Sequence, residues 1–237
     1  MIDMMEKKEN LKSYYLTIAL TTVLGMSVTL IRIVMPLNVT ITPWIVILEM
    51  ALELAVCFAI IWLNRVELKE IFKAKLKKKD IDVISLGFIV AFCSNIAFSL
   101  IRNFIYFAAT AVPYGTTSAG AAVVQRTFFK AFPIGVIITT SIIAPIWEEI
   151  VFRFTLRKLF KNTVLFVAVS SILFGFLHTG SIFDFEILEY ILFGVIFCLL
   201  YLKTKDLRKV VAMHMVYNIT INVMSLTAMI AGLINKG

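Results

Sequence analysis

The chain has 237 residues, of which 60% are hydrophobic and 16% are charged, and its mean hydropathy is +0.94. Soluble domains are nearer half apolar and a quarter charged, so this composition excludes the soluble, disordered and disulfide-rich secreted classes. The net charge of +8 is concentrated in short segments between apolar runs. Because it forms no continuous basic face, it does not indicate a nucleic-acid partner. The composition predicts a polytopic membrane protein whose surroundings are the lipid bilayer.

The apolar runs give the number of membrane spans. A bilayer core about 30 Å thick requires about 20 apolar residues per helix. We therefore predict an all-α fold, a polytopic membrane helical bundle of about seven transmembrane helices with room for an eighth. Little chain remains for a soluble part, so residues 1–237 are expected to form a single integral membrane domain. The predicted spans lie at residues 14–36, 44–63, 83–108, 128–152, 163–183, 187–202 and 210–233.

The basic residues predict the orientation of these spans. Of the 23 Lys and Arg residues, 18 lie before residue 13 and in the segments 65–79, 153–161 and 203–209. With seven spans, all four segments fall on the same side of the membrane. Short loops rich in Lys and Arg stay in the cytoplasm. We therefore expect a multi-pass protein of the cell membrane with a cytoplasmic N-terminus.

Ionisable side chains within a span are costly, so each one predicts either a functional site or an ion pair. A first group, Arg32, Glu49, Glu53 and Arg102, falls in the outer halves of the first three spans. Glu49 and Glu53 share a helix face and could bind a metal or relay protons. Two carboxylates and two guanidiniums at similar depth also neutralise each other, and this favours structural ion pairs.

A second group lies in the C-terminal half. Glu148 and Glu149 are adjacent, and Arg153 is four residues after Glu149, so these two can pair along one helix face and leave Glu148 freer. Pro145, just before them, should loosen the backbone hydrogen bonding one turn earlier. The chain's two histidines, His178 and His214, lie in later spans.

Counting about 1.5 Å per helical residue from the predicted cytoplasmic ends places Glu148 and His178 at similar depths, roughly 20 and 22 Å. The same count places His214 only about 8 Å deep. For the three side chains to meet, the last helix must tilt or begin nearer the surface. Asn218 is four residues after His214 and shares its helix face.

These residue types suit the activation of water. Glu148 with His178 could act as a general base, while His214 with Asn218 could donate hydrogen bonds to the oxyanion of a tetrahedral intermediate. Alternatively, Glu148, His178 and His214 could bind Zn²⁺ and leave one coordination position open for water. Both mechanisms are compatible with the sequence, and zinc is the one cofactor that they suggest.

Three short motifs contain these residues: EExxxR at Glu148, Glu149 and Arg153, FxxxH ending at His178, and HxxxN from His214 to Asn218. In this order the motifs resemble those of the CPBP family of intramembrane proteases, which includes CAAX prenyl endopeptidases and the bacteriocin-processing or immunity proteins also called Abi. The resemblance covers residues 130–225. It implies a helical-bundle glutamic protease or metalloprotease whose first glutamate and first histidine activate water.

The sequence therefore predicts an intramembrane endopeptidase that acts on a hydrophobic peptide or a membrane-associated or lipidated protein. The chain is short and ends without an endoplasmic-reticulum retrieval signal, so we expect the bacterial cytoplasmic membrane and a small peptide precursor as substrate. The alternative is a non-enzymatic immunity or regulatory protein that binds a toxin or a sensor kinase. A proton-coupled transporter is a weaker alternative because no inverted repeat is evident.

Overall fold

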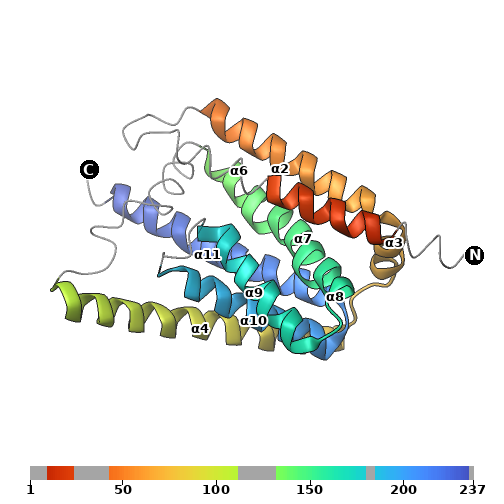
Figure 1. The fold of residues 1–237 in the computed structure, drawn as a ribbon. Helices are drawn as coiled ribbons and strands as arrows, with labels where there is room; N and C mark the ends of the chain where they lie inside the picture. Colours follow the sequence, from red (N-terminus) through yellow and green to blue (C-terminus); the bar gives the residue numbers. More distant parts are fainter. Residues whose placement is uncertain (1–9, 24–42, 112–131, 180–184, 235–237) are drawn as a thin grey trace, which may run out of the picture.

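The computed structural model describes residues 10–23, 43–111, 132–179 and 185–234 (Figure 1). Within these residues every regular element is a helix and none is a strand, which confirms the predicted all-α membrane bundle. Residues 10–23 form the first helix. The other elements are α2 (Pro43–Leu63), α3 (Arg65–Lys73), α4 (Lys78–Thr110), α6 (Pro133–Ile138), η1 (Thr139–Ile143), α7 (Ala144–Glu149), η2 (Ile150–Thr155), α8 (Leu156–Leu159), α9 (Thr163–Thr179), α10 (Ile187–Thr204) and α11 (Leu207–Ile234).

Four helices of the described part are long and apolar enough to cross a bilayer: α4, the continuous stretch Pro133–Leu159, α10, and Leu207–Ala228 of α11. The apolar helix α9 and the Met50–Leu63 part of α2 are shorter. Each of the seven predicted spans overlaps a described helical segment. The short helix α3, between the second and third predicted spans, was not predicted. Seven spans remains the predicted count.

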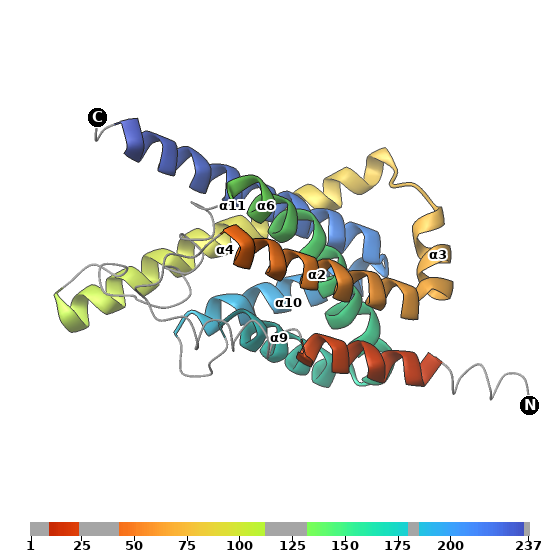
Figure 2. The same ribbon diagram turned by 90° about the horizontal axis from the view of Figure 1, so that it is seen from above.

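The stretch Pro133–Leu159 is the central helix of the bundle. It packs against α2 on one side and against α9, α10 and α11 on the other (Figures 1 and 2). An apolar helix that is covered on most sides belongs in the middle of a bundle, and most of this one is buried. In contrast, α4 contacts α11 and α10 from the outside and leaves most of its side chains on the surface of the bundle.

The central helix contains two π-helical segments, η1 and η2. At the end of η1 the Ala144 N–H bonds to the Thr139 carbonyl, five residues back. The next donor in this pattern would come from residue 145, which is a proline and has no N–H. The Thr140 carbonyl therefore lacks this backbone donor. The loosening expected at Pro145 thus takes the form of a π-helical segment one turn earlier.

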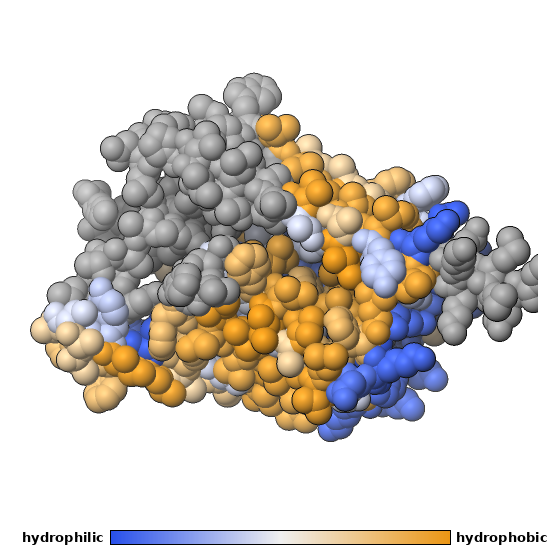
Figure 3. Space-filling view, in the orientation of Figure 1, coloured by the Kyte–Doolittle hydropathy of each residue, from blue (hydrophilic) through white to orange (hydrophobic). Residues whose placement is uncertain are grey.

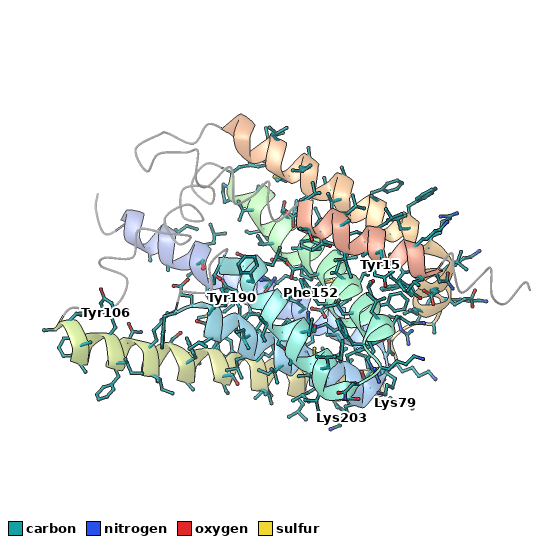
Figure 4. The ribbon with its side chains drawn as sticks, viewed as in Figure 1. Tyr15, Lys79, Tyr106, Phe152, Tyr190 and Lys203 are labelled. Atoms are coloured by element: carbon teal, nitrogen blue, oxygen red, sulfur yellow. The ribbon has the colours of Figure 1, made fainter. Side chains whose placement is uncertain are left out.

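Hydrophilic residues gather at one end of the bundle, where α3 and α8 lie, next to a broad apolar surface (Figure 3). We call this end the basic end, because the last turns of these two helices carry Lys73, Arg157 and Lys158. Lys79 and Lys203 mark this end in Figure 4. There Glu67 of α3 accepts a hydrogen bond from Tyr14 and pairs with Lys158 of α8 at 2.9 Å. Arg153 is an exception that corrects the sequence analysis. It was counted with the basic loops, but its side chain is completely buried in the core.

Candidate active site

The six predicted site residues come from three parts of the fold. Glu148 and Glu149 end α7, and Arg153 follows in η2 on the same central helix. His178 is at the end of α9, while His214 and Asn218 lie in the first half of α11. Because the central helix packs against both α9 and α11, residues up to 70 positions apart in sequence meet inside the bundle.

Glu148 lies between the two histidines and is only 5% exposed. Its Oε1 atom is 3.8 Å from His178 Nε2, and its Oε2 atom is 3.8 Å from His214 Nε2. These separations exceed the length of a direct hydrogen bond and suit contact through one small molecule such as water. Among the described residues, no side chain or backbone group forms a hydrogen bond with Glu148 Oε2. Glu148 is therefore the carboxylate that faces the two imidazole rings.

The hydrogen bonds of the two rings define their tautomers. His178 Nδ1 is 2.8 Å from the Phe174 carbonyl oxygen, and His214 Nδ1 is 2.8 Å from Glu149 Oε1. A carbonyl oxygen and a carboxylate can only accept, so we assign the ring proton to Nδ1 in both histidines. In the neutral rings each Nε2 then directs a lone pair toward Glu148. The Glu148 carboxylate and the two Nε2 atoms are thus all proton acceptors.

Glu149 and Arg153 form the predicted ion pair, and both side chains are fully buried. Glu149 Oε2 is 3.1 Å from Arg153 Nε. The guanidinium also donates to the Gly194 carbonyl at 3.4 Å and lies over the Phe174 and Phe197 rings, 4.7 and 5.0 Å from their centroids. The sequence analysis missed the second contact of Glu149, its bond to His214. Glu149 thereby joins the buried arginine to His214.

Aromatic side chains enclose the histidines. The His178 ring lies between Phe174, 4.4 Å away between centroids, and Tyr190, which stacks on it at 4.5 Å. Phe197 lies 4.6 Å from the His214 ring. Tyr190, labelled in Figure 4, and Phe197 belong to α10, and the sequence analysis did not single them out because α10 carries no motif. These rings pack against the two histidines and form the apolar part of the site.

Asn218 lies one turn beyond His214 and donates from Nδ2 to the Thr140 carbonyl at 2.7 Å. This is the carbonyl that lacks a donor because of Pro145. One of the two N–H groups of Asn218 is therefore used to close the gap in the central helix. The second N–H remains the one that could bind an oxyanion. A structural role and the predicted role can thus coexist in one amide.

The depth estimate for His214 was wrong. It placed His214 much nearer the cytoplasmic side of the membrane than Glu148, whereas the His214 ring contacts both glutamates. The count assumed parallel helices with a uniform rise of 1.5 Å per residue. Two π-helical segments interrupt that rise in the central helix, and the helices cross at visible angles (Figure 2). The depth of a residue counted along one helix therefore cannot be compared directly with a depth counted along a neighbouring helix.

The donor chemistry of Glu148, His178 and His214 suits zinc, since each can supply one nitrogen or oxygen ligand. The groups bonded to the two Nδ1 atoms, a carbonyl and a carboxylate, are also those that usually orient zinc-binding histidines. Their arrangement does not fit a metal centre as it stands. Within the described ranges, no three His, Cys, Asp or Glu side chains are grouped closely enough to hold a metal ion.

The first charged group is only partly described by the structure. Arg102 pairs with Glu186 at 3.6 Å and Glu189 at 3.2 Å, next to or within α10, and these two partners were not predicted. Glu53 accepts a hydrogen bond from Trp147 Nε1 at 3.2 Å, beside Glu148. The predicted ion pairs among the four residues of this group stay a prediction. Arg32 and the side chain of Glu49 lie outside the described parts of the structure.

Comparison with known proteins adds an independent observation. Residues 130–220 match the family model described as type II CAAX prenyl endopeptidase Rce1-like. The chain is 34% identical over 87 residues to the UPF0177 protein YaiH of Lactococcus lactis subsp. lactis (strain IL1403), covering 37% of this chain and 36% of that protein. It is 30% identical over 131 residues to the "UPF0177 protein in abiGi 5'region" of Lactococcus lactis subsp. cremoris, covering 52% and 56%.

A third relative is the "Putative membrane peptidase YdiL" of Bacillus subtilis (strain 168), 34% identical over 100 residues, which are 41% of this chain and 39% of that protein. The matches therefore span only between about a third and somewhat over half of these relatives. No solved structure matches the chain significantly. All six candidate site residues, from Glu148 to Asn218, fall within the matched segment. The resemblance inferred from the motifs is thus confirmed for residues 130–220, which are similar to type II CAAX prenyl endopeptidases of the Rce1-like kind.

Proposed function

We propose that this protein is an intramembrane endopeptidase that hydrolyses a peptide bond in a hydrophobic, membrane-associated peptide. The family match and the peptidase relative support a membrane protease in general terms. One observation carries the finer proposal: the buried Glu148 carboxylate lies 3.8 Å from the Nε2 atoms of both histidines. A carboxylate and an imidazole lone pair on either side of a water molecule can polarise it and accept its proton.

Each step of the reaction can be written with side chains alone. A water held between Glu148 and His178 gives its proton to the Glu148 carboxylate as its oxygen attacks the substrate carbonyl. The tetrahedral intermediate collapses, the carbon–nitrogen bond breaks, and the same proton passes to the leaving amine. Glu148 is thereby returned to its starting state. This sequence needs no oxidant, reductant or additional reactant.

His214 and Asn218 are suited to the developing negative charge on the carbonyl oxygen. Asn218 can donate through the N–H that does not bond to Thr140. His214 can donate from Nε2 when it carries a second proton, and Glu149 on its Nδ1 side would balance the resulting positive charge. Donors fixed in a low-dielectric site stabilise an oxyanion more strongly than donors in water. Burial of the site would thus strengthen the stabilisation of the oxyanion by His214 and Asn218.

The substrate is expected to be a short hydrophobic peptide or a lipidated segment. The site is enclosed by helices within an apolar bundle, so a substrate has to enter it from the bilayer or from the membrane surface. Aromatic rings from α9 and α10 line the site on either side of His178. A small secreted or signalling precursor would meet both requirements.

Glu148→Gln tests the proposal. This variant keeps the shape of the side chain and removes the base. Purified protein is incubated with a panel of hydrophobic peptides, and products are identified by mass spectrometry. Cleavage should fall by roughly 10²- to 10⁴-fold, as expected for loss of a general base. Glu189→Gln is the matched control, because Glu189 is a largely enclosed glutamate that bonds to Asn95 and Arg102 of α4 outside the site.

The control should cleave within a few fold of the wild type. Activity of Glu148→Gln close to that of the wild type would remove Glu148 from the mechanism. A folded wild-type protein that cleaves none of the peptides would instead favour the immunity or regulatory function, in which the same residues serve binding.

A further inference from the structure

A second asparagine, Asn222, lies one helical turn beyond Asn218 on α11. It is 5% exposed, although it lies within a helix long and apolar enough to span the membrane. Its Nδ2 atom donates to Thr140 Oγ1 at 2.7 Å and to Ser141 Oγ at 2.8 Å. Both of its N–H groups are therefore bound to consecutive hydroxyls of η1. Placing a polar side chain inside a membrane span costs free energy, so such a residue is a candidate for a functional role.

Thr140 is the residue on which the two asparagines converge. Its carbonyl accepts from Asn218, and its hydroxyl accepts from Asn222 while donating to the Val136 carbonyl at 2.8 Å. Because residue 145 is a proline, no backbone N–H at that position completes the ladder at the Thr140 carbonyl. The side chains of α11 thus replace a bond that the central helix cannot make. Thr140 is thus bound by two asparagines of α11 that lie one helical turn apart.

The position of Thr140 determines how Asn218 is oriented. An amide group is planar, so its bond to the Thr140 carbonyl sets the direction of the second N–H as well. If η1 shifts along α11, the direction of the second N–H of Asn218 therefore changes with it. Asn222 opposes such a shift through two hydrogen bonds. Its effect on the reaction would therefore be indirect and pass through Thr140.

We propose that Asn222 is a positioning residue for the oxyanion donor Asn218, acting through the Thr140 hydroxyl of η1. This inference rests on the proposed protease function. The bonds of Asn222 run to two hydroxyls of η1 and not to the reacting groups, so its loss should affect turnover more than substrate binding. A misplacement of about 1 Å in a catalytic group can reduce a rate by about 10²-fold.

The first test compares Asn222→Ala with Asn64→Ala. Asn64 is a matched control because it is also a buried asparagine, 3% exposed, whose Nδ2 donates to Thr17 Oγ1 and to the Ile60 carbonyl. It lies where α2 meets α3, near the basic end. Both variants should lower the melting temperature by a similar amount. Only Asn222→Ala should lower kcat, by roughly 10- to 100-fold, with KM within about twofold of the wild type.

The second test asks whether the effect passes through Thr140. Thr140→Val removes the hydroxyl at nearly constant volume and should reproduce the loss in kcat, whereas Thr140→Ser keeps the hydroxyl and should retain most of the activity. The double variant Asn222→Ala with Thr140→Val should be no slower than either single variant, because both break the same contact. Independent, multiplying losses would overturn the proposed route.

Hydrogen exchange of the peptide covering residues 139–144 provides a readout that does not depend on cleavage. Exchange should be faster in Asn222→Ala than in the wild type, and unchanged in Asn64→Ala. Unchanged exchange in Asn222→Ala, or equal losses of kcat in both asparagine variants, would overturn the inference. If the folded wild type cleaves nothing, the protease proposal fails, while the exchange data still decide whether Asn222 holds η1 in place.

Discussion

Two adjacent glutamates have different surroundings because successive side chains on a helix point about 100° apart. Glu149 faces Arg153 and His214, and both of its oxygens lie within 3.1 Å of a positive or donor group. Glu148 faces the Nε2 atoms of the two histidines at longer range. One carboxylate therefore has a close partner at each oxygen, whereas the histidine nitrogens that face the other lie 3.8 Å away.

Glu149→Gln should destabilise the protein strongly. Glu149 and Arg153 are both fully buried, and removing one member of a buried ion pair costs about 3–5 kcal/mol because the other charge is left unpaired. Thermal unfolding in detergent should show a large fall in melting temperature. The control is Glu70→Gln, since Glu70 pairs with Lys73 on an exposed surface and such pairs contribute about 0–1 kcal/mol. Equal melting temperatures for the two variants would contradict the structural role of Glu149.

Metal content separates the two mechanisms at the same residues. We expect purified, active protein to contain far less than one equivalent of zinc and to keep its activity in a chelator. Asn218→Ala should lower the rate by roughly 10²- to 10³-fold, as expected for loss of an oxyanion donor, and leave the metal content unchanged. Stoichiometric zinc that disappears together with activity in His214→Ala would instead establish the zinc mechanism.

At the scale of elements, the site depends on the close approach of α9 and α10. A Cβ atom built on Gly194 would lie 2.7 Å from the Ser171 Cα atom, and one on Gly175 would lie 2.8 Å from an Ile191 side-chain carbon. Only glycine allows the two backbones to come this near. The same approach brings the Gly194 carbonyl to Arg153, so helix packing and the site share one contact.

Gly194→Ala should therefore push α10 away from α9. The atom that the new methyl group meets belongs to the backbone and cannot rotate aside. Overpacking of this kind typically costs about 1–3 kcal/mol, and the melting temperature should fall accordingly, together with activity. Gly87→Ala is the matched control, because its methyl group would meet only side-chain atoms of Leu200 and Met213, no nearer than 3.3 Å. A harmless Gly194→Ala would show that α9 and α10 tolerate separation.

At the scale of the whole molecule, polar contacts join different helices at the basic end. Lys209 of α11 pairs with Asp80 of α4 at 2.8 Å, and Arg208 donates to the Ala74 carbonyl after α3. These contacts hold the ends of several helices together, where charged groups can reach water. The distribution of apolar and polar surface (Figure 3) is that of a bundle with this end at a membrane boundary.

The basic end should face the cytoplasm. Single cysteines placed at Lys77 and Lys205 should be protected from a membrane-impermeant thiol reagent in intact cells, whereas cysteines at Ser118 and Gly237 should react. All four should react after the membrane is permeabilised, which controls for accessibility. Reaction at Lys77 with protection at Ser118 would invert the orientation and the side from which a substrate reaches the site.

The sequence by itself determined the class of fold and singled out the residues of the candidate site. Apolar runs report directly on burial in lipid, so helices appear wherever the described residues cover a predicted span. Ionisable residues are rare at membrane depth, so Glu148, His178 and His214 stood out without any knowledge of their contacts. Helical spacing was sufficient to predict the Glu149–Arg153 ion pair, because residues four positions apart lie on the same face of one helix.

Only the tertiary structure decided how these residues contact one another. The bond between Glu149 and His214, the position of Tyr190 over His178, and the pairing of Arg102 with α10 all join distant parts of the chain. Such contacts depend on crossing angles and on helix irregularities, and one-dimensional spacing does not encode either directly. The depth of His214 that was estimated from straight helices was wrong for this reason. The residue types thus indicate the chemistry of the candidate site, while the packing of irregular helices determines its geometry.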